Sequence, residues 1–383
     1  MQSETVSTHV AWKEPPWLQQ YRERNAAIVK QAPLQKSKYS NIAFLERLSE
    51  FPPTKELLPL PLELESKGIR VFSWGQALRE CENELRLALE NEFPSKDQFE
   101  AIVNARFNSG FVLLVENAKP SQLLEWQLPL PLHAMAKNVI IVRENAESVH
   151  LLETVRGENV RFNQTVLVQE NASVSFASLF DFSAYSLVGL QSVLQHDSQL
   201  HSANAWMKGE MTRGRVSNVL NGSGASMVQR DWNLGSQKDR LDLDLLLLHK
   251  NHSTKSHSVF KSVLDQSAYS VFEGMIKILP SGQQTTAFLE AHGLLLSPNA
   301  SNNNIPGLEI EADDVKATHS ASVSHLDEEA LFYLLSRGID EKAAKQMVAM
   351  GFLESLVHEL PLSFQAPLVQ ALESKWDSIS ANK

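Results

Sequence analysis

Residues 139–151 read VIIVRENAESVHL, residues 165–176 read TVLVQENASVSF and residues 192–202 read SVLQHDSQLHS. In each segment a short apolar run leads into a polar turn and then into a second run of alternating residues. Asn145, Asn171 and Asp197 stand at matching turns, so that the turns recur at equal intervals. A fixed period of this kind indicates a stack of similar coils.

Short β-type runs separated by Asn, Gly, Asp and Ser continue through residues 108–324. An antiparallel sandwich also has many short strands, but it would contain more tight turns than the one at Asn221-Gly222. We therefore predict a mostly β protein with a parallel right-handed β-helix core over residues 108–324. Apolar side chains of the repeats would point inward, namely those of Val139, Ile141, Val166, Val168, Val193 and Leu194.

The regions on either side of this core are predicted to be helical. Residues 1–107 combine many prolines with a helix over 17–31 and a long helix over 73–93, which Ser73 would cap and which would contain Cys81. Residues 325–383 form a C-terminal helical subdomain. In this subdomain Asp327 caps a first helix that ends at Gly338, and Asp340 caps a second helix that runs to residue 360.

Composition excludes several classes of protein. The 383 residues contain 35 Lys and Arg against 45 Asp and Glu, a net charge of -10 that disfavours nucleic acids and anionic membranes. Apolar runs are far shorter than the roughly 20 residues that cross a bilayer, and the first residues lack a signal-peptide pattern, so we expect a cytoplasmic protein. No phosphate-binding loop occurs, which argues against an ATPase.

Histidines are the main chemical candidates. His249, His252 and His257 would bind zinc or iron if their rings converged, but odd spacing on a strand points side chains to opposite faces, which favours a polar turn. The adjacent carboxylates Asp313 and Asp314 diverge for the same reason. His319 lies among small residues at the last predicted coil, where its imidazole would be accessible to another surface.

Residues 313–339, DDVKATHSASVSHLDEEALFYLLSRGI, closely resemble the hallmark of the SufB/SufD family, the β-helical scaffold proteins of Suf iron-sulfur cluster assembly. Similar matches lie at 68–80 (GIRVFSWGQALRE), 104–115 (NARFNSGFVLLV), 137–153 and 257–278. Within the family this chain looks like SufD, because Cys81 is its only thiol and sulfur transfer needs a thiolate.

The resemblance implies a non-catalytic scaffold that pairs with a SufB-type subunit through its β-helix and binds a SufC-type ATPase subunit through its C-terminal helices. It implies no tightly bound cofactor, only a transient iron-sulfur cluster shared with SufB, for which His319 matches the family's candidate ligand. Ala317 stands where many members carry a cysteine. The expected SufC contacts are Leu331, Phe332, Leu335, Met347, Met350, Phe352 and Leu353.

The sequence leaves three alternatives open. One is a β-helical carbohydrate-active enzyme, which would carry carboxylates on neighbouring coils and would usually be exported. Another is a metalloenzyme built on His249, His252 and His257. The third is a SufD-like homodimer. Flavin binding, the cluster type and the route of iron are not predicted.

Overall fold

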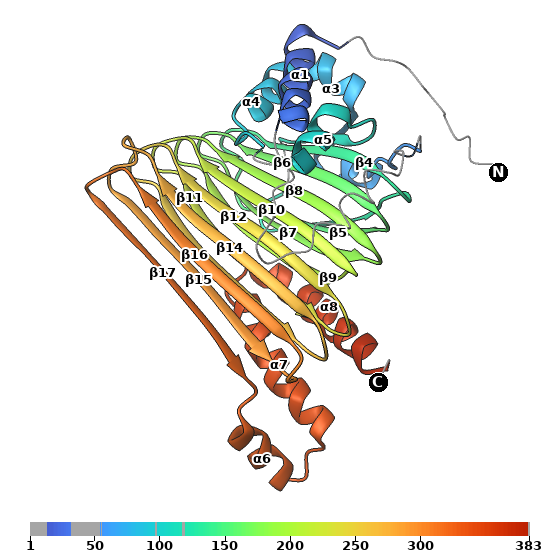
Figure 1. Ribbon diagram of the computed structural model, residues 1–383. Coiled ribbons are helices and arrows are strands. Elements are labelled where there is room, and N and C mark those ends of the chain that lie inside the picture. The colour runs from blue at the N-terminus through green and yellow to red at the C-terminus, as the bar shows by residue number, and fades with distance from the viewer. Residues whose placement is uncertain (1–13, 32–53, 55, 96–97, 117–118, 382–383) are drawn as a thin grey trace, which may run out of the picture.

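The computed structural model describes residues 14–31, 54, 56–95, 98–116 and 119–381 (Figure 1). The helices are α1 (Pro16–Gln31), the short 3-10 helix η1 (Leu62–Lys67), α3 (Trp74–Glu80), α4 (Glu82–Glu90), α5 (Gln98–Arg106), α6 (Glu328–Ser336), α7 (Glu341–Val357) and α8 (Leu362–Ala381). The N-terminal segments 1–13 and 32–53 of the predicted helical region lie outside the described residues.

The strands fall into two sheets, which we call the even sheet and the odd sheet after the strand numbers that predominate. The even sheet contains β1 (Ile69–Ser73), β2 (Phe111–Val115), β4 (Met135–Val142), β6 (Val160–Val168), β8 (Tyr185–Leu194), β10 (Met211–Leu220), β12 (Arg240–His249), β14 (Tyr269–Ile278) and β16 (Ser301–Ile310). The odd sheet contains β3 (Leu123–Pro129), β5 (Val149–Gly157), β7 (Ser173–Phe182), β9 (Gln199–Lys208), β11 (Ser226–Gly235), β13 (Lys255–Leu264), β15 (Thr285–Leu295) and β17 (Val315–His325).

Within each sheet the strands follow one another in sequence order, two numbers apart. Neighbouring strands pair in parallel except β1, which joins β2 antiparallel. The chain therefore alternates between the two sheets as it advances along the stack. This confirms the predicted mostly β fold and its β-helix core; the exact domain boundaries at 107/108 and 324/325 stay predictions.

The predicted turns set the period of the stack. Asn145, Asn171 and Asp197 have φ angles of 60°, 57° and 50°, a left-handed conformation that Asn and Asp tolerate better than most residues. The Asn171 Nδ2 donates to the Asn145 Oδ1 at 3.4 Å, 26 residues away in the chain. The turns of successive coils are thus stacked upon one another, as the sequence repeat predicted.

The first strands of the even sheet are buried on both faces. Part of the predicted core was therefore assigned to the wrong face of the sheet. Val166, Val168 and Leu194 point into the β-helix as predicted. The side chains of Val139, Ile141 and Val193 instead lie on the outer face of the even sheet, in a cluster with the N-terminal helices. A strand covered on both sides carries a continuous apolar run, so alternation alone does not reveal which side faces inward.

The N-terminal helices α4 and α5 pack on β4 and β6, as Figure 1 shows at the top of the molecule. The helix predicted over 17–31 is confirmed as α1. The single helix predicted over 73–93 is wrong, because the chain turns at Cys81, which ends α3 and begins α4. A buried ion pair fastens these helices to the sheet: the Lys137 Nζ lies 2.7 Å from the Glu92 Oε1.

The C-terminal helices begin where the sequence predicts. The Asp327 carboxylate accepts a hydrogen bond from the Glu329 backbone N–H at 2.9 Å, and the Asp340 carboxylate accepts one from that of Ala343 at 3.1 Å. Gly338 follows α6 with a φ of 85°. Helices α7 and α8 pack on the outer face of the odd sheet, so the molecule has helices on both sides. None of the described helices is long and apolar enough to cross a membrane.

Candidate functional site at the open end of the β-helix

Among the described residues, the last coil of the β-helix, made of β16 and β17, has no further strand beside it. β16 is the end strand of the even sheet and β17 the end strand of the odd sheet, and both lie at the left edge of the molecule in Figure 1. Three apolar side chains of this coil, those of Leu308, Ile310 and Val323, are exposed. An uncovered edge with exposed apolar side chains favours pairing with another chain.

His319 belongs to the inward-facing row of β17. Its register partner on β15 is Leu289, which is fully buried in the core of the β-helix. Residues in register on parallel strands point to the same face of a sheet, so the imidazole of His319 is directed toward the interior side of the last coil. His319 is nevertheless exposed, and its side chain makes no hydrogen bond to any described residue. The ring is therefore accessible at the mouth of the β-helix.

Behind this mouth the interior contains two buried carboxyl groups. Glu153 accepts hydrogen bonds from the Ser178 hydroxyl and the Gln164 amide, both at 2.7 Å. Asp231 accepts hydrogen bonds from Asn204 and Gln229. Burial raises the pKa of Glu153 to about 7 and that of Asp231 to about 7, although these hydrogen bonds oppose the shift. Their hydrogen-bond partners lie on the same or neighbouring coils and do not include His319, so both groups belong to the core of the β-helix.

Helix α6 is the most exposed apolar element of the C-terminal region. In Figure 1 it extends beyond the ends of the strands, and it has no buried residue. Phe332 is 72% exposed and Leu335 40%, while Met347 in the first half of α7 is 54% exposed. We call these three residues, with the neighbouring Tyr333, the α6 patch. Tyr333, which the sequence prediction omitted, is 56% exposed; its position next to Phe332 was the available signal.

The other predicted contact residues lie deeper. Met350 and Leu353 are buried in the cluster that joins α7 and α8 to the odd sheet. Phe352 packs against the same cluster, and Leu331 is half-buried. Met350 and Leu353 are therefore not available on the surface of this chain, whereas the residues of the α6 patch are.

The three clustered histidines do not converge. His249 is fully buried inside the β-helix, where its ring nitrogens lie 2.8 Å from the Thr254 hydroxyl and 2.9 Å from the Ser256 hydroxyl. Burial lowers the pKa of His249 to about 3, so its ring is neutral. His252 is exposed at the following turn, and His257 lies on the outer face with its Nε2 3.1 Å from Glu290. No group of three His, Cys, Asp or Glu residues that could hold a metal ion occurs among the described residues.

Cys81 is poorly suited to carry sulfur. Its side chain is 2% exposed, in the N-terminal helical region and outside the β-helix. Burial, with a smaller contribution from Glu84, raises the pKa of the thiol to about 12. The reactive form of a cysteine is the thiolate, so this thiol is inert at neutral pH.

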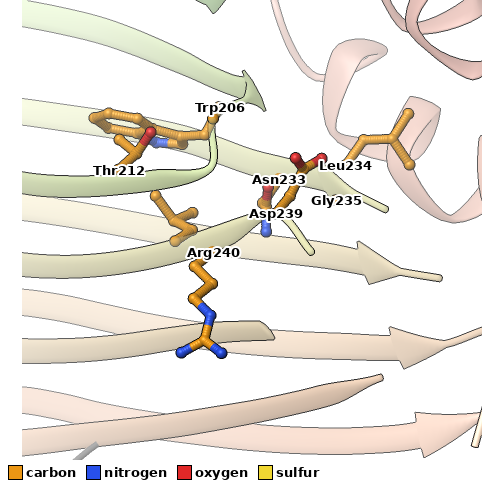
Figure 2. A pocket seen from close by; sticks show the side chains of 9 residues that line it. Trp206, Thr212, Asn233, Leu234, Gly235, Asp239 and Arg240 are labelled. Carbon is orange, nitrogen blue, oxygen red and sulfur yellow. The ribbon is translucent and has the colours of Figure 1, made fainter. Parts of the chain in front are cut away.

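One depression on the β-helix is too small for a substrate. Figure 2 shows the side chains of Trp206, Asn233 and Asp239 around it, at the turns that join β9 to β10 and β11 to β12. Its volume is about 10 Å³. A space of this size holds at most about one water molecule, so it offers no enzyme active site.

Known proteins resemble this chain along most of its length. The family model for the SUF system FeS cluster assembly, SufBD core domain, matches residues 131–352. An iron-sulfur cluster assembly SufBD family protein of Staphylococcus epidermidis is 26% identical over 314 residues, which cover 79% of this chain and 68% of that protein. SufBD family proteins of Staphylococcus saprophyticus and Staphylococcus aureus are each 25% identical over the same shares. Since the family model spans more than half of the chain, including β4 to β17 with the open end and helix α6, the chain belongs to the SufBD family.

Proposed function

We propose that this chain is the SufD-type subunit of a Suf complex: a cytoplasmic, non-catalytic scaffold on which iron-sulfur clusters are assembled. The observation that carries the proposal is the open last coil, which presents His319 beside edge strands and exposed apolar side chains. The buried, protonated thiol of Cys81 supports the SufD assignment, because this chain then depends on a partner for the thiolate that accepts sulfur.

The proposed partner at the open end is a SufB-type subunit. Its β-helix would continue the stack, pair with the free edges of β16 and β17, and cover the apolar side chains of the last coil. His319 would then lie at the interface and, with a thiolate of the partner, hold iron and sulfide as the transient cargo. A neutral imidazole is a good ligand for iron, and small neighbours such as Ala317 and Ala321 leave room around it.

The proposed partner at the α6 patch is a SufC-type ATPase subunit. Contacts from α7 and from the residues just after it to the odd sheet support a transmission of motion. The Lys261 Nζ donates to the Ser355 hydroxyl of α7 at 2.6 Å, and Arg230 pairs with Glu359, which follows α7, at 2.6 Å. Lys261 lies on β13, which is joined through β15 to β17 and His319. Closure of two ATPase subunits would pull on α6 and shift the coil that presents His319.

The proposal is tested by reconstituting the complex with SufB-type and SufC-type subunits. His319→Ala should lower the yield of acid-labile sulfide and of the visible cluster absorbance, while gel filtration shows an intact complex. Thr318→Ala is the matched control, since Thr318 is exposed on the same strand but its side chain points to the opposite face. Normal cluster yield in the His319 variant would remove the histidine from the proposed site, and failure to bind either partner would reject the SufD-type assignment.

A further inference from the structure

The outer face of the even sheet is only partly covered. The N-terminal helices contact β4, β6 and β8, and beyond them Phe93 reaches over the sheet. Between Phe93 and the strands β10, β12, β14 and β16 lies a pocket of about 300 Å³. Small-molecule sites in proteins occupy roughly 300–1,000 Å³, so this pocket has the size of a small-ligand site.

The floor of the pocket is apolar. Leu246 and Met275 form a small cluster with Phe93 on this face of the sheet. Met275 lies in register with Gly307 on β16, and a Cβ atom at Gly307 would come within 2.7 Å of the Met275 Cε. The methionine side chain thus packs directly over the glycine backbone and forms an apolar part of the wall, against which the body of a ligand can pack.

The cationic side chains around the pocket already have partners. Arg213 binds two carboxylates: it pairs with Asp242, and its Nη2 lies 2.7 Å from the Asp244 Oδ2. The Arg215 Nε lies 3.4 Å from the Glu100 Oε2. Lys277 pairs with Glu309 and, at 3.6 Å, with Glu311.

The carboxylate of Glu273 forms no ion pair with any of these cations. It lines the pocket, half-buried, in register with Asp244 on the next strand. Its carboxylate has no hydrogen bond and no ion pair to any described residue. Its pKa is raised, first by burial and then by the charges of Asp244 and Asp242, with Arg213 acting in the opposite direction. The wall of the pocket around Glu273, Asp244 and Asp242 therefore carries an excess of negative charge.

We propose that this pocket binds a small organic cation, in which an ammonium group is attached to an apolar body. The ammonium would donate hydrogen bonds to Glu273 and Asp244, and the apolar body would lie against Met275, Leu246 and Phe93. An anionic ligand is disfavoured, because the arginines and the lysine are already paired and Glu273 would repel it. The proposal does not depend on the proposed function in cluster assembly.

The test uses the full chain and three probes of similar shape: phenethylammonium, the neutral 2-phenylethanol and the anionic 3-phenylpropionate. Titration calorimetry should show that the ammonium probe binds more tightly than the alcohol by about tenfold or more, the effect of one charge-assisted hydrogen bond. Equal or tighter binding of the alcohol or the carboxylate would overturn the proposal, and so would the absence of binding of the ammonium probe.

Two variants test whether the probe binds in this pocket. Glu273→Gln should weaken the ammonium probe by about tenfold and leave the alcohol unchanged, whereas Glu170→Gln, at an exposed turn far along the stack, should change neither. Gly307→Ala should weaken both probes, because the added methyl group would displace the Met275 side chain against which the apolar body packs. Thermal unfolding of each variant checks that it is folded. Unchanged binding in folded Glu273→Gln protein would show that the cation does not bind at this pocket.

Discussion

His319 and Leu289 occupy the same inward-facing position on neighbouring strands, yet Leu289 is fully buried and His319 is exposed. The difference between them is a single layer of the stack. The coil of β17 covers Leu289, whereas none of the described strands covers His319. A chain that continued the β-helix would bury the histidine in the same way, which makes this position sensitive to the partner.

The α6 patch and the buried residues of α7 are predicted to respond differently to an added charge. Leu335→Asp should abolish capture of a SufC-type subunit in a pull-down and leave the melting temperature nearly unchanged, because Leu335 is exposed. Met350→Asp should lower stability by several kcal/mol, about 3 or more, since it buries an unpaired charge in the core. Retained capture by Leu335→Asp would place the docking surface elsewhere.

The stability of the protein should fall as the pH rises toward neutrality. Glu153 titrates near its usual pKa of 4.5 when unfolded, but burial raises its pKa to about 7 in the folded protein. Its contribution is therefore complete below the unfolded pKa and is lost as the pH rises through about 7, a change on the order of 3 kcal/mol. Urea unfolding at about pH 5 and about pH 8 measures it. Glu153→Gln should reduce this dependence and leave the part that Asp231 contributes, since the pKa of Asp231 is also raised to about 7. An unchanged slope would show that Glu153 is not buried as a neutral acid.

The ion pair between Lys137 and Glu92 is predicted to hold the N-terminal helices on the even sheet. Lys137 is 1% exposed, and its Nζ also donates to Asn104 at 3.0 Å. Lys137→Ala should destabilise the protein by about 3–5 kcal/mol, because it leaves the Glu92 charge buried without a cation. Chemical denaturation provides the measurement, with the exposed pair Arg86 and Glu90 as a control: Arg86→Ala should cost about 0.5 kcal/mol at most.

The thiol of Cys81 should react only when the protein unfolds. Its burial and its raised pKa both keep the thiolate from a reagent in solution. An aromatic disulfide reagent should label no thiol in the native protein within minutes and one thiol after addition of guanidinium. Fast labelling of the native chain would show that Cys81 is accessible and would weaken the argument against sulfur transfer.

The β-helix was predictable because its signal is local and repeated. Asn145, Asn171 and Asp197 mark turns whose backbone conformation only a few residue types adopt readily. Asp327 and Asp340 cap the helices for an equally local reason, since each carboxylate binds backbone N–H groups within three residues. The break at Cys81 was not predictable in this way, because no proline or glycine marks it.

The candidate site was predictable only in part. The sequence singled out His319 and its small neighbours, but the register with Leu289 is needed to know that its ring faces the mouth of the β-helix. The same limit applies to Phe332 and Met350, two apolar residues that the sequence treated alike. Phe332 is 72% exposed and Met350 is 6% exposed, because the burial of a helical residue depends on which element packs against its helix.

By itself, then, the sequence determined the repeating coils, the helix starts and the lack of a second thiol, all of which depend on residue type and short-range spacing. Only the tertiary structure decided which side chains of the coils face inward, which apolar residues remain for a partner, and that Glu273 is left without a cation beside a pocket. These properties arise from contacts between residues far apart in the chain, and no local pattern encodes them.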